Sequence, residues 1–142
     1  MGTRANHIYI GQNINDVLPN FANGITDEEI NNLPDVVITY SHWDGYPENI
    51  GQEIVDILEK HQGIRQYDNE YCGARVLQHL MGCPQEGNYL SFGICNQIHG
   101  DIAYLYVIDN GGVAMFKANG YDSKSYSFIK YVNTRSNTNN HY

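Results

Sequence analysis

Six consecutive residues gather most of the side-chain types with which proteins bind small molecules. They are His42-Trp43-Asp44-Gly45-Tyr46-Pro47, hereafter segment 42–47, and they contain the only Trp of the chain. Asp44 could orient His42 or accept a hydrogen bond from a ligand hydroxyl or amine. Trp43 or Tyr46 could stack on a planar group, and Gly45 would let a ligand approach the backbone. The alternative is structural, with Asp44 capping a helix and Trp43 filling the core. The segment therefore indicates a binding site without specifying a reaction.

An anionic ligand would need positive charge near this segment. The chain has four arginines, Arg4, Arg65, Arg75 and Arg135. Arg4 directly precedes a strand pattern and could clamp an anion with two parallel hydrogen bonds. Arg75 could reach the same pocket from a helix or point to solvent, and Arg4 could instead pair with Asp44 or Asp35. The backbone N–H groups of residues 48–50, at the start of a helix, could hold a phosphate or carboxylate.

The histidines and cysteines give weak support to catalysis or metal binding. None of the six histidines has the spacing of a metal site, and no nucleophile or phosphate-loop motif occurs. His42 and His99 each have a carboxylate two residues away, in Asp44 and Asp101, so an acid/base pair is an alternative. The three cysteines lack a close pair and predict reduced thiols. We expect no catalytic residue, metal or cofactor.

Hydrophobic periodicity predicts the elements that position these residues. The expected strands span residues 7–10, 35–41, 90–95, 101–109, 113–118 and 126–132, and the expected helices span 47–63 and 68–81. Within residues 101–109, Tyr104 and Tyr106 could form an aromatic wall with Asp101 and Asp109; alternatively, the tyrosines pack on the sheet face or form a subunit interface. Tight turns between consecutive strands favour antiparallel pairing. We expect an α+β fold, a mostly antiparallel sheet with two helices packed on one face.

The chain is predicted to form one domain over residues 1–133. Residues 11–34 are rich in Asn and Gly and predict an insertion, within which Thr26 and Glu29 form a capping box. The polar stretch 134–142 predicts a flexible C-terminal tail.

The amino-acid composition argues against two kinds of binding partner, nucleic acids and membranes. Sixteen acidic residues against eight Lys and Arg give a formal charge of −8, which opposes nucleic-acid binding. The mean hydropathy is −0.47, and no apolar run is long enough to cross a bilayer. The first residues lack the apolar core of a signal peptide. We expect a cytoplasmic protein that binds neither nucleic acid nor membrane.

Two motifs suggest a family. The opening Met1-Gly2-Thr3-Arg4 and the segment 42–47, continued by Glu48-Asn49-Ile50-Gly51, resemble small proteins encoded by bacteriophages and prophages. The stretches 71–74 and 100–104 are similar as well. The resemblance marks a family and implies no reaction, but it implies the short list of tasks that phage proteins of this size perform, among which counter-defence is prominent. For a phage-encoded protein, the cytoplasm in question is that of the host cell.

The ligand chemistry and the phage resemblance together lead to three hypotheses. The first is a non-enzymatic binder that sequesters a nucleotide-derived immune signal, a cyclic dinucleotide or a cyclic ADP-ribose-like molecule. Its ligand-binding residues would be Arg4, His42, Trp43, Asp44, Tyr46 and Arg75, and it would be a homo-oligomer, because such sites often form between subunits. The second is an enzyme that degrades the signal through His42 and His99. The third is a protein-binding inhibitor of a host defence complex such as a CRISPR effector.

Overall fold

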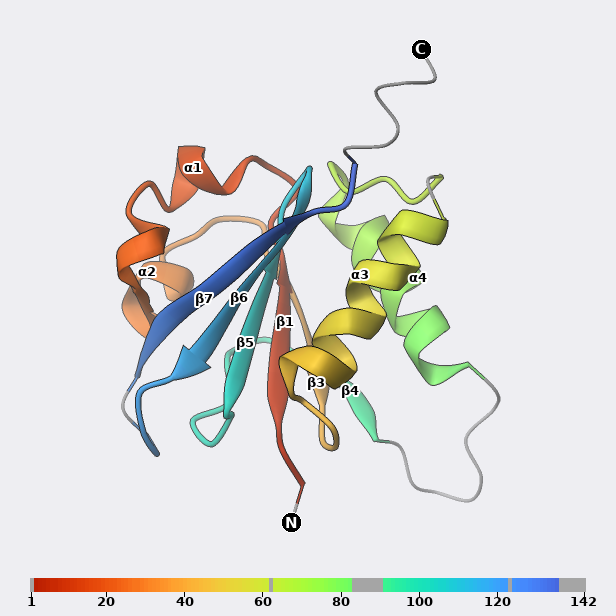
Figure 1. The fold of residues 1–142 in the computed structure, drawn as a ribbon. Helices are drawn as coiled ribbons and strands as arrows, with labels where there is room; N and C mark the ends of the chain where they lie inside the picture. The colour runs from red at the N-terminus through yellow and green to blue at the C-terminus, as the bar shows by residue number, and fades with distance from the viewer. Residues whose placement is uncertain (1, 62, 83–90, 123, 136–142) are drawn as a thin grey trace.

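The computed structural model describes residues 2–61, 63–82, 91–122 and 124–135. A seven-stranded sheet forms the centre of the molecule, with helices on both of its faces (Figure 1). The strands are β1 Ala5–Tyr9, β2 Ile25–Thr26, β3 Val37–Ser41, β4 Phe92–Cys95, β5 Tyr104–Ile108, β6 Gly112–Ala118 and β7 Ser125–Asn133. The helices are α1 Ile14–Val17, α2 Asp27–Asn31, α3 Gln52–Lys60 and α4 Asn69–Met81, with a 3-10 turn at Phe21–Asn23 and a π-helical turn at Pro47–Gly51.

The sheet has the strand order β2-β7-β6-β5-β1-β3-β4. Five of its six neighbouring pairs are antiparallel, and β1 with β5 is the parallel pair. The predicted α+β class with a mostly antiparallel sheet is therefore confirmed. The hairpins β5–β6 and β6–β7 join strands that are consecutive in sequence, as the turn signals indicated. The central place of β1, between β3 and β5, is set by long-range pairing.

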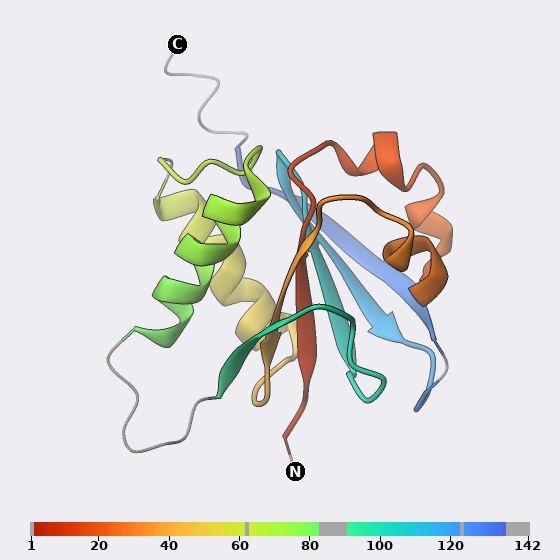
Figure 2. The same cartoon turned by 180° about the vertical axis from the view of Figure 1, so that it is seen from behind.

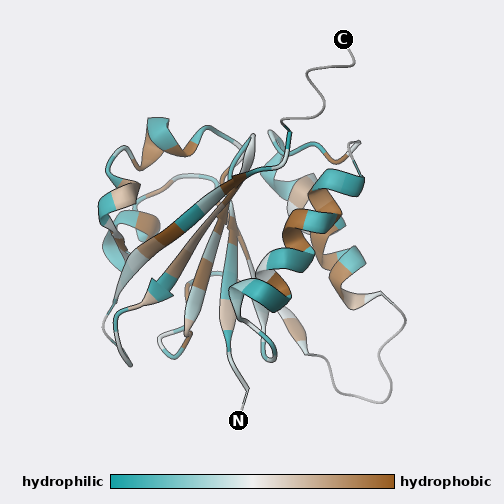
Figure 3. Cartoon of the chain, viewed as in Figure 1, coloured by the Kyte–Doolittle hydropathy of each residue, from teal (hydrophilic) through white to brown (hydrophobic). Residues whose placement is uncertain are grey.

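The two long helices, α3 and α4, pack together on one face of the sheet (Figure 2). Apolar residues recur along both helices and along the central strands (Figure 3), and residues of the two sets pack in one core cluster. The sheet contributes the buried residues Tyr9 and Tyr106 to this core, and the helices contribute Ile54, Leu58 and Val76. Fully burying a side chain of this kind contributes about 2 kcal/mol, so this face is a principal source of stability.

The opposite face is covered by the segment that the sequence suggested was an insertion. Within residues 11–34, the side chains of Ile14, Leu18, Ile25 and Ile30 are buried against the sheet. A sheet whose strands are apolar on both faces needs a cover on each. Residues 11–34 therefore belong to the core of the domain, although their polar composition suggested a decoration.

Local capping predictions can be checked directly. Thr26 and Glu29 form the predicted capping box at the start of α2. The side chain of Asp68 accepts from the amide of Tyr71 and caps α4.

Thr134, expected to begin a flexible tail, is instead buried, and its hydroxyl donates to Gln66 Oε1 at 3.2 Å. Residues 136–142 of the expected tail lie outside the described residues.

Among the described residues, no helix is both long and apolar enough to cross a membrane. Cys72 and Cys95 are free thiols. Burial raises the pKa of Cys72 to about 12, so this thiol stays protonated and unreactive at neutral pH. Cys83 lies outside the described residues.

Candidate functional site

Segment 42–47 lies at the end of β3, against the residues that precede β1. The antiparallel register pairs Ala5 with Ser41, so the chain entering β1 runs beside the chain leaving β3. The amide of Gly45 donates to the carbonyl of Thr3 over 2.9 Å. Thr3 and segment 42–47 are therefore in direct contact, although about forty positions separate them in the sequence.

Two glycines allow this contact. A Cβ on Gly45 would lie 2.7 Å from the carbonyl oxygen of Thr3. A Cβ on Gly2 would lie 2.3 Å from the carbonyl oxygen of His42 and 2.7 Å from the Trp43 ring. Any larger residue at either position would push the two backbones apart, so the close approach itself accounts for glycine in both stretches.

Arg4 reaches across this contact to two partners. Its Nη1 forms an ion pair with Asp101 Oδ2 at 2.9 Å, and its Nε donates weakly to His42 Nδ1 at 3.4 Å. Both ion-pair side chains are about one-third exposed, at 34% each. The partners expected for Arg4 in a structural role, Asp44 or Asp35, are replaced by Asp101. Arg4 is thus held in place while part of its side chain stays exposed to solvent.

Tyr40 joins the two histidines that sequence reasoning considered as an acid/base pair. Its hydroxyl lies 2.9 Å from His42 Nδ1, and its ring stacks on His99 at 4.2 Å between centroids. Burial raises the pKa of Tyr40 and outweighs the opposing effect of Arg4. Because Arg4 Nε can only donate to Nδ1, Nδ1 is an acceptor, so the Tyr40 hydroxyl also donates to it and the ring hydrogen of neutral His42 is on Nε2. We call Arg4, Tyr40, His42, His99 and Asp101 the Arg4 cluster.

Trp43 and Tyr46 are both accessible, with 43% of each residue exposed. They open onto different cavities. Trp43 and Asp44 line a cavity of about 350 Å³ with Glu53 and Phe92, called here the Trp43 cavity. Tyr46 lines a cavity of about 340 Å³, called the tyrosine cavity, whose other walls include Asp101, Tyr104, Lys117 and Tyr121.

The charges of the two cavities differ. The Trp43 cavity is acidic: burial, followed by the nearby carboxylates of Asp44 and Asp56, raises the pKa of Glu53. Such a field repels phosphate. The tyrosine cavity instead holds Lys117 together with Asp101, the partner of Arg4. It combines one cation, one carboxylate and three aromatic rings.

The tyrosine rings of this second cavity are tilted relative to one another or exposed. Tyr46 and Tyr104 lie 5.7 Å apart at an interplanar angle of 56°, and Tyr121 is 83% exposed. Burial, then Glu48, raises the pKa of Tyr104, so its hydroxyl is neutral at physiological pH. Tyr106, the other tyrosine of the expected aromatic wall, is fully buried and belongs to the core.

The expected anion site at the helix start is wrong for two of its three amides. The amide of Asn49 donates to the carbonyl of Tyr46, and the amide of Ile50 donates to the carbonyl of Asp44; both N–O distances are 3.0 Å. Asp44 has φ of 55°, a left-handed conformation that turns its carbonyl back over the π-helical turn. The backbone of Asp44 thus satisfies an amide that would otherwise face a ligand, and the N-cap of the turn is Tyr46, which makes no side-chain capping hydrogen bond, rather than Asp44.

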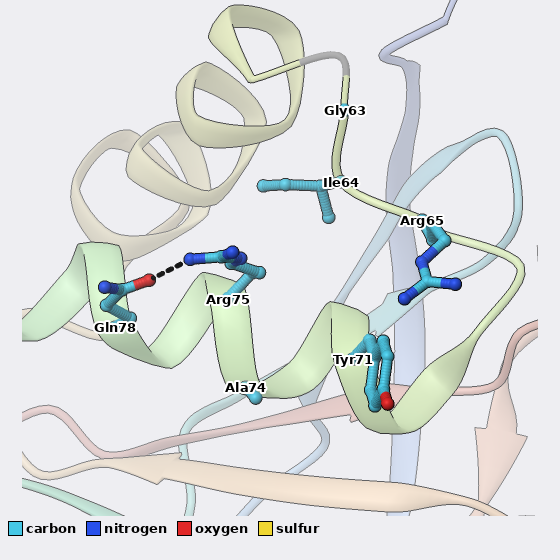
Figure 4. Close-up of a pocket in the computed structure, with 7 residues that line it drawn as sticks. All are labelled: Gly63, Ile64, Arg65, Tyr71, Ala74, Arg75 and Gln78. Carbon is cyan, nitrogen blue, oxygen red and sulfur yellow. Dashed lines mark hydrogen bonds between the residues drawn. The ribbon is translucent and has the colours of Figure 1, made fainter.

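Arg75 does not join the other predicted site residues. It lies on α4 and lines a third cavity together with Arg65, as Figure 4 shows. Its Nη1 donates to Gln78 Oε1 at 2.9 Å. The structure therefore leaves Arg75 apart from the other five predicted residues, and it divides those five among the Arg4 cluster with Arg4 and His42, the Trp43 cavity with Trp43 and Asp44, and the tyrosine cavity with Tyr46. The residues that sequence reasoning did not select for the site are Tyr40, Asp101, Tyr104, Lys117 and Tyr121.

Within the part of the chain that the structure describes, no group of three metal-binding side chains comes together. Comparison with known proteins finds no matching family model, no matching curated protein and no matching solved structure.

Proposed function

We propose that this protein binds and sequesters a small nucleotide-derived immune signal, such as a cyclic dinucleotide or a cyclic ADP-ribose-like molecule, as a phage-type counter-defence protein. The supporting observation is the tyrosine cavity beside segment 42–47. Aromatic rings supply stacking faces for a base, Lys117 supplies a cation for a phosphate, and Asp101 accepts hydrogen bonds from base N–H groups. The phage context comes from the sequence resemblance.

The dimensions and charges fit one nucleotide unit. A volume of about 340 Å³ lies within the range of small-molecule sites, and the open mouth lets the rest of a larger signal extend along the protein. Arg4 lies at the border of the cavity through its ion pair with Asp101. A ligand phosphate arriving there competes with Asp101 for the guanidinium, so Arg4 forms the second contact to negative charge.

A release assay tests the proposal. The protein is incubated with a panel of nucleotide signals, separated from free ligand and heat-denatured, and the released material is identified by mass spectrometry. We expect one class of signal to be depleted and then released intact. Absence of depletion would contradict the proposal and leave partner binding as the remaining hypothesis. Light scattering on the same preparation checks the expected homo-oligomer.

Two substitutions locate the ligand in the tyrosine cavity. Tyr46→Ala removes a stacking face, worth about 1–3 kcal/mol per base, and Lys117→Gln removes a phosphate contact. We expect each to weaken binding about 10- to 100-fold in a titration of the retained signal. Lys130→Gln makes the same charge change at an exposed position of β7 and serves as the control. Equal affinity of Lys117→Gln and Lys130→Gln would place the ligand elsewhere.

A specific observation favours an enzyme as the second candidate. His42 and His99 contact the same tyrosine, so two groups able to transfer protons lie within one cluster. If the released signal is cleaved, His42→Gln and His99→Gln are expected to lower turnover at least 100-fold while depletion of the signal persists. Cleavage that survives both substitutions would contradict this mechanism.

A further inference from the structure

One face of α4 is polar and open, and it carries a repeating pattern. Tyr71, Ala74, Arg75 and Gln78 are spaced three, four and seven residues apart, which places them on the same side of the helix. All four are exposed. The buried residues of α4, such as Val76, pack on the opposite side. This face is therefore available to a ligand without disturbing the core.

The chain between α3 and α4 adds a second arginine to this face. Arg65 lies over the ring of Tyr71, with its guanidinium carbon 4.5 Å from the ring centroid. Arg65, Tyr71, Arg75 and Gln78 line a cavity of about 500 Å³ with Ala74 and the buried Ile64 (Figure 4). We call it the α4 cavity.

Neither guanidinium of the α4 cavity is neutralised by a carboxylate among residues 2–61, 63–82, 91–122 and 124–135. In the described part of the chain, neither Arg65 nor Arg75 forms an ion pair, whereas Arg4 does. The nearby carboxylate of Asp68 accepts from the amide of Tyr71. The Oε1 atom of Gln78 accepts the hydrogen bond from Arg75. The amide nitrogen of Gln78, Nε2, therefore points away from Arg75 and its hydrogens remain available as donors. In a chain of net charge −8, this is a local concentration of hydrogen-bond donors and positive charge.

We infer that the α4 cavity is a second binding site that takes the phosphate group of a small organic phosphate. Two guanidiniums and an amide nitrogen offer more donors than one carboxylate can accept, whereas a phosphate dianion has three terminal oxygens for them. Guanidinium groups match phosphate geometry by paired N–H donors. Tyr71 and Ile64 supply apolar surface beside the charge for the organic part of the molecule.

This site is separate from the tyrosine cavity. The two cavities share no lining residue. Figures 1 and 2 place the N-terminus and segment 42–47 at one end of the sheet and the link between α3 and α4 at the opposite end. The inference therefore stands whether or not the proposed function holds.

Phenyl phosphate and inorganic phosphate are suitable probes, with benzoate as the carboxylate comparison. In an NMR titration of the full chain at low salt, we expect both phosphates to shift the amides of Arg65, Ala74, Arg75 and Gln78. Tighter binding of phenyl phosphate would assign the site to phosphate esters, and equal binding would assign it to the phosphate group alone. Benzoate is expected to bind at least 10-fold more weakly.

Arg65→Gln and Arg75→Gln are expected to weaken phenyl phosphate binding at least 10-fold each, because each removes charge-assisted hydrogen bonds. Both positions are exposed, so the variants are expected to keep the unfolding temperature of the original protein. Lys130→Gln, with the same loss of charge on β7, is expected to change the affinity less than twofold. Shifts confined to other residues, or an Arg75→Gln variant that binds like Lys130→Gln, would overturn the inference.

Discussion

Lowering the pH from 7 to 4 is expected to reduce the free energy of unfolding by about 3 kcal/mol through one residue, His7. His7 is fully buried in β1, and its ring nitrogens bond to the hydroxyls of Thr39 over 2.8 Å and Ser41 over 3.0 Å. Burial lowers its pKa from 6.5 to about 3. The neutral ring is therefore part of the folded structure.

The direction of the effect follows from proton binding. Between pH 6.5 and about 3 the unfolded chain binds a proton at His7 and the folded chain does not. Stability contributed by the neutral ring is present above pH 6.5 and is lost as the pH falls, by about 1.4 kcal/mol per pH unit. Urea unfolding curves recorded at pH 7, 5 and 4 measure this slope.

A matched pair of variants separates His7 from other titrating groups. His7→Gln keeps a donor and an acceptor but does not titrate. We therefore expect the free energy of unfolding to fall less steeply with decreasing pH, by about 1.4 kcal/mol per pH unit, which is the contribution of one proton. The variant is less stable than the original protein at pH 7. The pKa of His79 is also lowered, by slight burial and by the charges of His61 and Arg75, and contributes in the same direction. His79→Gln at this exposed position is expected to keep most of the slope. A His7→Gln variant with the full slope would show that other groups govern acid stability.

The same contacts connect this stability to the candidate site. Thr39 and Ser41 lie on β3, which leads directly into segment 42–47, and His7 faces Thr39 in the strand register. Protonation of His7 therefore weakens the pairing that places Arg4 beside His42. We expect ligand retention to disappear over the same pH range as the unfolding transition.

Local sequence patterns predicted the elements around the site well, because each depends on residues close in sequence. The strand before segment 42–47, the helix after it and the helix expected over 68–81 all follow from periodicity. The cover formed by residues 11–34 was missed because their few apolar side chains are dispersed among polar ones. Their burial becomes evident only once the sheet they cover is known.

The composition of the site depended on pairing that no local pattern encodes. The parallel pair of β1 and β5 lets the amide of Ala103 donate to the carbonyl of Arg4 over 2.9 Å. That register carries Asp101 to the guanidinium of Arg4 and Tyr104 to Tyr46. Arg75 was wrongly grouped with Arg4 because a helical position alone does not indicate which end of the molecule a side chain faces.

Gly45→Val is expected to lower the free energy of unfolding by about 3 kcal/mol and to abolish ligand retention, because it separates the two stretches that form the site. A Cβ at this position would lie 2.7 Å from the carbonyl oxygen of Thr3 and 3.1 Å from the Cβ of Ala5. These atoms belong to the backbone and side chain at the start of a central strand, so they have little freedom to move away.

The displacement would also break two hydrogen bonds that hold the turn. The Gly45 amide donates to Thr3, and the buried hydroxyl of Tyr106 donates to the Gly45 carbonyl. Leaving the Tyr106 hydroxyl without a partner costs about 1–3 kcal/mol on its own. Gly93→Val is the control, because a Cβ on Gly93 in β4 meets no atom within 4 Å and valine favours strands. Thermal unfolding and the release assay on both variants check the prediction: if Gly45→Val were as stable and as active in retention as Gly93→Val, the close approach of Thr3 to segment 42–47 would not be what builds the site.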